Sequence, residues 1–135
     1  MKVEKLAKNG QMVQNCYPLS PSGYPVPFDD VCLLEIQDLR SKYAERVKDI
    51  GFSGHHNGVA IDVAAYTLGA TWNERHFTKN RTWKGTDHAA SLEPGGMEKL
   101  VRDLHATWKC MSHKREEILP IEGVQRQKLK WGFYN

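Results

Sequence analysis

Cysteine is scarce in this chain of 135 residues: there are three, at positions 16, 32 and 110, with no CxxC spacing. This scarcity argues against a disulfide framework and a structural zinc module, and it favours a reducing cytoplasm. Apolar runs fall short of the roughly 20 residues of a membrane span, and the first residues lack the apolar region of a signal peptide. The net charge is only +3, with no basic run that could follow a phosphate backbone. We therefore expect a cytoplasmic protein with no membrane or nucleic-acid partner.

The length and the 40% hydrophobic composition suit one domain with an ordinary core. A Pro-, Ser- and Gly-rich loop over residues 17–30 follows a short amino-terminal piece. Asp29 or Asp30 is expected to cap the first helix after this loop. Hydrophobic periodicity then predicts alternating helices and strands: helix 31–43, strand 47–53, helix 58–70, strand 71–77 and helix 94–111. The basic segment 120–135 has no pattern and is predicted to be a tail.

Alternating strands and helices predict βα units on a parallel sheet, because parallel neighbours need a crossover connection. Ligands of such sheets bind at the carboxyl ends of the strands. Ser53 and His55 stand at the end of one predicted strand, and Glu74 and His76 at the end of the next. Because strand side chains alternate, the members of each pair share a face. If the strands are neighbours, both histidines can meet one cation.

Simpler interpretations of these residues stay open. A histidine at a strand end is more often a hydrogen-bonded polar group than a ligand. The carboxylates of Glu74 and Asp87 can pair with nearby cations, as loop carboxylates often do: Arg75, Arg81 or Lys84. Ser91 is interpreted as a helix cap.

Four segments of the sequence resemble the sialic acid synthase family, which makes N-acetylneuraminate and related nonulosonic acids. The segments are SGYPVPFDD at 22–30, GFSGH at 51–55, LGATWNERHFT at 68–78 and RTWKGTDHAASLEP at 81–94. The resemblance covers about residues 22–122. A fainter likeness at residues 3–13 points to a segment further upstream in the family.

The resemblance implies a metal-dependent condensation of phosphoenolpyruvate with N-acetylmannosamine or its 6-phosphate. The metal would be Mn²⁺, with Mg²⁺ or Co²⁺ as alternatives, and its ligands would be His55 and His76. Ser53 would hold the phosphate of phosphoenolpyruvate. Tyr24 and Asp87 would contact the amino sugar, and Asp87 and Glu74 would be the catalytic carboxylates. His56 stands at a variable family position and is a competing ligand for the metal.

The resemblance also implies an α/β fold that is only part of a (β/α)8 TIM barrel. A whole barrel takes about 250 residues, so the matched part corresponds to about the last three βα units. The family's early strands carry lysines and a glutamate that bind phosphoenolpyruvate and activate water, and no segment here matches them. The chain divides into an amino-terminal segment 1–21, a partial barrel 22–119 and a basic tail 120–135.

Two functional hypotheses follow. In the first, the chain is a synthase, active by itself or with a complementary barrel half. In the second, it is a truncated, non-catalytic paralogue that acts as a sugar- and metal-binding or assembly subunit. Under both, an incomplete barrel exposes sheet edges and apolar surface, so self-association is predicted.

Overall fold

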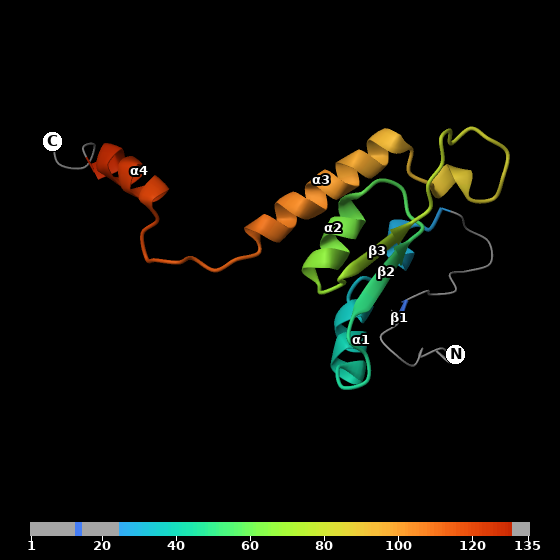
Figure 1. The fold of residues 1–135 in the computed structure, drawn as a ribbon, viewed down its shortest axis with the longest axis horizontal. Coiled ribbons are helices and arrows are strands. Elements are labelled where there is room, and N and C mark those ends of the chain that lie inside the picture. Colours follow the sequence, from blue (N-terminus) through green and yellow to red (C-terminus); the bar gives the residue numbers. More distant parts are fainter. Residues whose placement is uncertain (1–12, 15–24, 131–135) are drawn as a thin grey trace.

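The computed structural model describes residues 13–14 and 25–130 and contains a three-stranded parallel sheet. The strands are β1 (Val13–Gln14), β2 (Ile50–Gly54) and β3 (Trp72–Arg75), in the order β1-β2-β3. Both strand pairs are parallel. The α/β class and the parallel sheet predicted from the sequence are confirmed (Figure 1).

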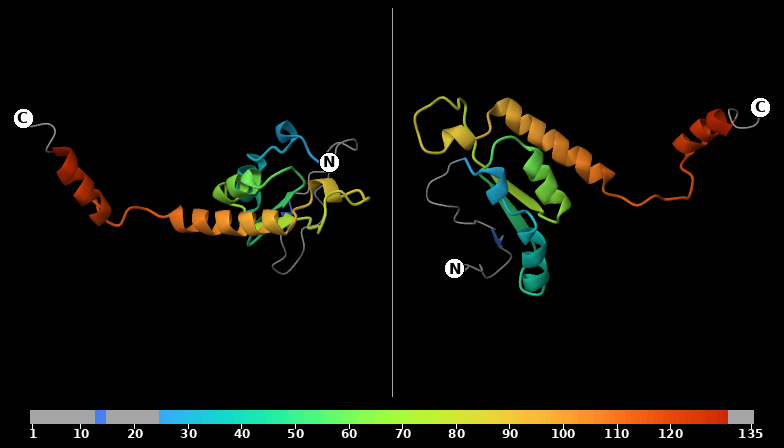
Figure 2. Two further views of the ribbon diagram at one scale, coloured as in Figure 1. Left: turned by 90° about the horizontal axis from the view of Figure 1, so that it is seen from above. Right: turned by 180° about the vertical axis from the view of Figure 1, so that it is seen from behind.

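Helices connect and flank these strands. α1 (Glu35–Tyr43) precedes β2, and α2 (Ala60–Thr67) joins β2 to β3. α3 (Pro94–Cys110) follows β3 and packs beside α2 (Figures 1 and 2). Two short 3-10 turns, Phe28–Asp30 and His88–Ala90, lie in the loops. α4 (Pro120–Lys130) lies apart from the sheet, at the end of the extended segment 111–119.

Two clusters of buried apolar side chains hold the helices against the sheet. The first contains Ile36 of α1, Ile50 and Phe52 of β2, and two alanines at the end of α2 and just after it: Ala65 and Ala70. The second joins Val59, Leu92 and Leu100, and therefore fixes α3 against the start of α2. Burial of such side chains contributes about 1.5–3 kcal/mol each and outweighs the weak intrinsic preferences of these short elements.

Two local predictions were wrong. The first helix begins at Glu35 and has no side-chain cap, whereas Asp29 and Asp30 lie in the 3-10 turn Phe28–Asp30. Cys32 has a φ of 50°, which interrupts helical geometry before Glu35. The segment predicted to be an unpatterned tail contains α4, which starts at Pro120, a favourable first helical residue because proline has no amide hydrogen to satisfy.

The surface of the described part of the chain carries several large apolar side chains that are more than half exposed. They include Trp72 and Phe77 at β3 and Trp108 on α3. Within this same part, no helix is long and apolar enough to cross a membrane. Self-association stays a prediction.

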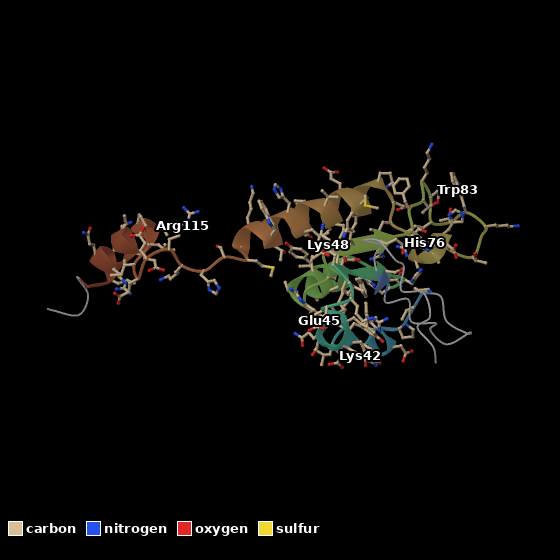
Figure 3. The ribbon with its side chains drawn as sticks, turned by 60° about the horizontal axis from the view of Figure 1, so that its bottom comes forward. Lys42, Glu45, Lys48, His76, Trp83 and Arg115 are labelled. Carbon is tan, nitrogen blue, oxygen red and sulfur yellow. The ribbon has the colours of Figure 1, made fainter. Side chains whose placement is uncertain are left out.

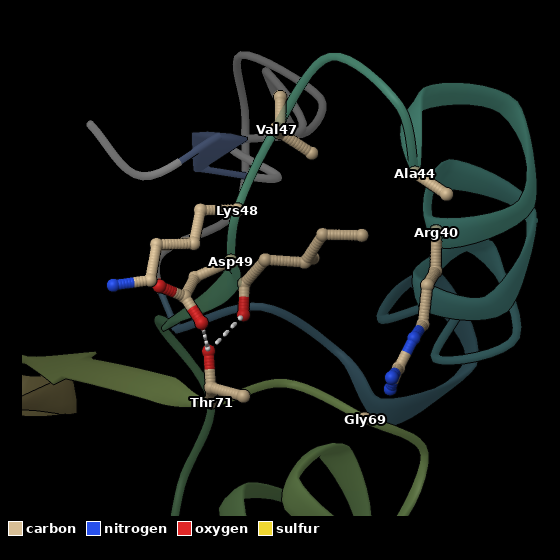
Figure 4. A pocket seen from close by; sticks show the side chains of 8 residues that line it. Arg40, Ala44, Val47, Lys48, Asp49, Gly69 and Thr71 are labelled. Atoms are coloured by element: carbon tan, nitrogen blue, oxygen red, sulfur yellow. Dashed lines mark hydrogen bonds between the residues drawn. The ribbon is translucent and has the colours of Figure 1, made fainter. Parts of the chain in front are cut away.

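A small pocket of about 240 Å³ lies at the amino ends of β2 and β3. Its lining includes Arg40, Lys48 and Asp49, and the hydroxyl of Thr71 donates to Asp49 Oδ1 at 3.2 Å (Figure 4). The pocket is at the opposite end of the strands from Ser53 and Glu74, so it is separate from the predicted site.

Candidate metal and substrate site

The carboxyl ends of β2 and β3 bring together residues that are distant in the sequence. In the parallel register Ser53 is opposite Glu74, and Gly54 is opposite Arg75. The Ser53 hydroxyl donates a hydrogen bond to Oε2 of Glu74. The expectation that these two strand ends are neighbours is therefore confirmed.

His55 and His76 follow the last register pair and face each other. Their ring centroids are 5.0 Å apart, with an angle of 57° between the ring planes. Both residues are partly buried. A centroid separation of 5.0 Å is compatible with both rings binding one ion, since metal–imidazole bonds are about 2.1 Å long.

The electrostatic surroundings favour a neutral His55. Burial lowers its pKa below the ordinary 6.5, the electrostatic effects of His76 and Arg75 lower it further, and the carboxylates of Glu74 and Asp87 oppose the shift. A neutral imidazole keeps the lone pair that a metal ligand needs.

Asp87 reaches the same place from the loop after β3. Its Oδ2 lies 3.6 Å from Nδ1 of His76, and its side chain is about half exposed (51%). The Ser91 hydroxyl donates to the backbone carbonyl of Asp87 at 2.7 Å. Ser91 is therefore not the cap of α3, a position that Glu93 occupies. Figure 3 shows His76, directly after β3, and Trp83, in this loop, on the same side of the molecule.

The partners of the two carboxylates in the structure differ from the simpler interpretation, in which they pair with nearby cations. Glu74 accepts from Ser53, and the carboxylate partner of Arg75 is Asp62. Arg81 donates from its side chain to the Ala89 carbonyl. Glu74 is therefore bonded to Ser53, and Asp87 lies beside His76.

The donor set fits a metal that takes only part of its coordination from this segment. The described residues contain no group of three or more His, Cys, Asp or Glu side chains placed to hold an ion. Two facing imidazoles, with the carboxylates of Glu74 and Asp87 beside them, leave the other positions to oxygens of water or substrate. Mn²⁺ and Mg²⁺ accept such oxygens readily.

A buried charged cluster behind the histidines is not apparent from the sequence. The Arg75 Nη1 donates to Asp62 Oδ2 at 2.5 Å, and His56 Nε2 lies 3.2 Å from the same oxygen. His56 and Asp62 are almost fully buried, at 1% and 0% exposure. The interpretation of His56 as a competing metal ligand was wrong, because its ring points into the interior, away from His55. Tyr24 lies outside the described residues.

Comparisons with known proteins show the family of the chain. A profile of the NeuB family matches residues 6–116. The chain belongs to the NeuB family. The match includes every described candidate residue and extends upstream of the resemblance that starts at Ser22.

Two curated relatives are similar to most of this chain. N-acetylneuraminate-9-phosphate synthase of Homo sapiens is 40% identical over 114 residues, which are 84% of this chain and 31% of that protein. N,N'-diacetyllegionaminic acid synthase of Campylobacter jejuni is 38% identical over 107 residues, which are 78% of this chain and 31% of that protein. The chain thus spans 31% of the length of each.

Two solved structures of TIM-barrel type resemble the fold. N-acetylneuraminic acid synthetase of Leptospira borgpetersenii, solved in complex with citrate, matches with a TM-score of 0.63 and 33% identity, over 84% of this chain and 38% of that one. A spore coat polysaccharide biosynthesis protein of Bacillus subtilis matches with a TM-score of 0.60 and 29% identity, over 71% of this chain and 28% of that one. The NeuB unit described here is therefore similar to part of larger proteins.

Proposed function

We propose that this NeuB-family unit carries the metal- and sugar-binding part of a nonulosonic acid synthase. The reaction would condense phosphoenolpyruvate with N-acetylmannosamine or its 6-phosphate. The enol carbon forms a bond to the sugar aldehyde, water adds to the adjacent carbon, and inorganic phosphate leaves. The observation that carries the proposal is the meeting of His55, His76, Ser53 and Glu74 at two adjacent strand ends.

His55 and His76 would hold a divalent ion, Mn²⁺ or alternatively Mg²⁺ or Co²⁺. When bound, the ion supplies positive charge that polarises the aldehyde oxygen of the sugar. The two rings are suited to this role because they face each other and because the lowered pKa of His55 keeps that ring unprotonated.

The carboxylates suit the sugar better than phosphoenolpyruvate. Phosphoenolpyruvate is an anion, which Glu74 and Asp87 would repel, whereas sugar hydroxyls donate hydrogen bonds to carboxylates. Asp87 is half exposed beside His76 and is free to approach a bound sugar. Both carboxylates can accept protons from hydroxyl groups during the reaction.

Ser53 would interact with the phosphate. Its hydroxyl carries one proton, which is donated to Glu74 in this structure. A phosphate oxygen near Ser53 would compete for that proton, and Glu74 would then turn to a sugar hydroxyl. The Ser53–Glu74 pair therefore links the two substrates at the same strand ends.

The rest of the phosphoenolpyruvate site would come from the barrel strands that this segment does not match. We propose that those strands are supplied by a complementary barrel half, either another chain or a further part of a longer one. The exposed Trp72 and Phe77 beside β3 are compatible with such a contact, since large apolar side chains at a sheet are normally covered.

Phosphate release from phosphoenolpyruvate tests the proposal. The purified chain is assayed with Mn²⁺ and either N-acetylmannosamine or its 6-phosphate, alone and mixed with the barrel-completing part of the Leptospira borgpetersenii relative. We expect release that requires metal and sugar, vanishes in His76→Ala and persists in His113→Ala, which alters an exposed histidine outside the site. If the chain mixed with the barrel-completing part releases no phosphate with either sugar although both parts fold, the catalytic proposal is wrong. The non-catalytic hypothesis then replaces it.

A further inference from the structure

Arg75 is a buried arginine on β3 between two candidate site residues, Glu74 and His76. The residue as a whole is 9% exposed and its side chain 1%. A buried guanidinium needs several hydrogen-bond acceptors to replace water. Those acceptors come from three separate segments of the chain.

The first segment is the turn after β2, which carries His55. Arg75 Nη2 donates to the His56 carbonyl at 2.7 Å, and Nη1 donates to the Gly58 carbonyl at 2.9 Å. The His56 carbonyl belongs to the residue directly after His55. The guanidinium therefore fixes the backbone that presents the His55 ring.

The second and third segments are α2 and the loop that carries Asp87. Nη1 donates to Oδ2 of Asp62 in the first turn of α2, and Nη2 donates to the Ala90 carbonyl at 3.3 Å. Ala90 ends the 3-10 turn that starts one residue after Asp87. One side chain therefore connects β3 to the turn with His55, to α2 and to the loop with Asp87.

This set of contacts requires a planar fork of donors. Arginine offers five N–H groups in fixed directions, whereas lysine has a single ammonium group and reaches fewer separated acceptors. The space around the fork is also filled: a Cβ at Gly54 would lie 2.8 Å from Arg75 Cδ and 2.9 Å from His56 Cε1. The end of β2 therefore packs directly on the cluster.

We propose that Arg75 is a positioning residue, which sets the mutual placement of His55, His76 and Asp87 by bonding the three segments that carry or adjoin them. Its importance for metal binding rests on the function proposed above, whereas its effect on the geometry of the two rings does not. Residues behind the ligands of a metal site commonly change metal affinity by about 10–100-fold when altered.

The test must separate positioning from stability. Arg75→Met leaves Asp62 buried without its partner and destabilises the fold for that reason alone. The double variant Arg75→Met/Asp62→Leu removes both charges together, so no unpaired charge is left in the interior. It still removes the bonds of Arg75 to the His56 ring and to the His56, Gly58 and Ala90 carbonyls. Arg75→Lys is the second variant, in case the double variant does not fold. Arg102→Met, which alters an exposed arginine of α3, is the matched control.

Two readouts are compared with the melting temperature. The first, without metal, is the nuclear Overhauser contact between the ring protons of His55 and His76, whose centroids are 5.0 Å apart. The second is the affinity for Mn²⁺ alone, measured by calorimetry. We expect the double variant to stay folded and to melt above Arg75→Met, to lose the ring contact and to bind Mn²⁺ about 10–100-fold more weakly.

An unchanged ring contact and an unchanged Mn²⁺ affinity in a folded double variant or a folded Arg75→Lys chain would overturn the positioning role. A parent chain that binds no Mn²⁺ would instead contradict the proposed metal site. In that case the ring contact still decides the role of Arg75: its loss in the variants supports positioning, and its persistence overturns it.

Discussion

The Ser53 hydroxyl donates a hydrogen bond to the Glu74 carboxylate across the β2–β3 pair. The two residues are 21 positions apart and become neighbours only through the parallel register. This bond joins the residue that we assign to phosphate with one that we assign to the sugar. It is also a contact whose strength can be measured without any ligand.

A double-mutant cycle of Ser53→Ala and Glu74→Ala, followed by urea unfolding, measures that strength. We expect Ser53→Ala to lower the free energy of unfolding by about 1 kcal/mol, because the net contribution of such a bond is modest at a partly buried site. The coupling between the two changes should be of similar size. Ser112→Ala, at an exposed serine after α3, should leave stability unchanged. Additive effects of Ser53→Ala and Glu74→Ala would mean that the bond does not form in solution.

Asp62→Ala should be one of the most destabilising single changes in the chain. It leaves the buried Arg75 guanidinium without its counter-charge, which typically costs about 3–5 kcal/mol. Asp103→Ala removes a carboxylate that pairs with the exposed Arg102, and its effect should stay within about 0.5 kcal/mol. Urea unfolding of both variants compares the two cases. Equal effects would show that Asp62 and Arg75 are solvated in the folded chain.

Leu100→Ala tests the packing of α3 against the start of α2. Leu100 is 4% exposed and contacts the cluster of Val59 and Leu92. Its truncation should lower the free energy of unfolding by about 2–5 kcal/mol. The adjacent Val101 is 59% exposed, so Val101→Ala is a matched control with an effect within about 0.5 kcal/mol. Similar losses from the two variants would contradict the orientation of α3.

The pKa of His55 in the metal-free chain can be followed by NMR titration of its ring proton. It should lie below the ordinary 6.5, mainly because of burial and secondarily because of His76. His76→Ala should therefore raise it, and Glu74→Gln should lower it further. Since the folded pKa is the lower one, the unfolded chain takes up the proton first. Above pH 6.5 the titration of His55 therefore has no effect on the free energy of unfolding. As the pH falls below that value, it lowers the free energy of unfolding. A His55 that titrates above 6.5 would contradict these surroundings.

Much of this arrangement follows from local patterns in the sequence. The stripe that includes Met97, Leu100 and Leu104 predicts α3, because apolar residues at helical spacing face one core. Alternation along two short strands predicts that Ser53 and His55 share a face, as do Glu74 and His76. The parallel pairing then follows from the helix between the strands.

The Arg75–Asp62–His56 cluster could not be predicted in this way. Charged residues in a sequence usually indicate surface, and the Arg75–Asp62 bond joins residues 13 positions apart on different elements. Its position next to His55 makes His56 look like a second metal ligand in the sequence. In the structure the His56 ring is buried against Arg75 and Asp62. One available signal is Gly54, since a glycine inside a strand often marks a close approach of other atoms.

The start of α1 could not be predicted from capping residues alone. Asp29 and Asp30 are good capping residues, yet the chain turns again at Cys32 before α1 starts at Glu35. Only the burial of Ile36 against β2 decides where that helix lies. α4 was missed although Pro120 and the acidic Glu122 are signals of a helix start.

The most direct test of the central claim is pulsed electron paramagnetic resonance of Mn²⁺ bound to the chain, with histidine nitrogens labelled. The account predicts coupling to nitrogens of two imidazoles, reduced to one in His55→Ala and in His76→Ala and unchanged in His113→Ala. Bound Mn²⁺ with no coupling to histidine nitrogen, or with coupling that survives both site variants, would show that the metal is held elsewhere and would contradict the account.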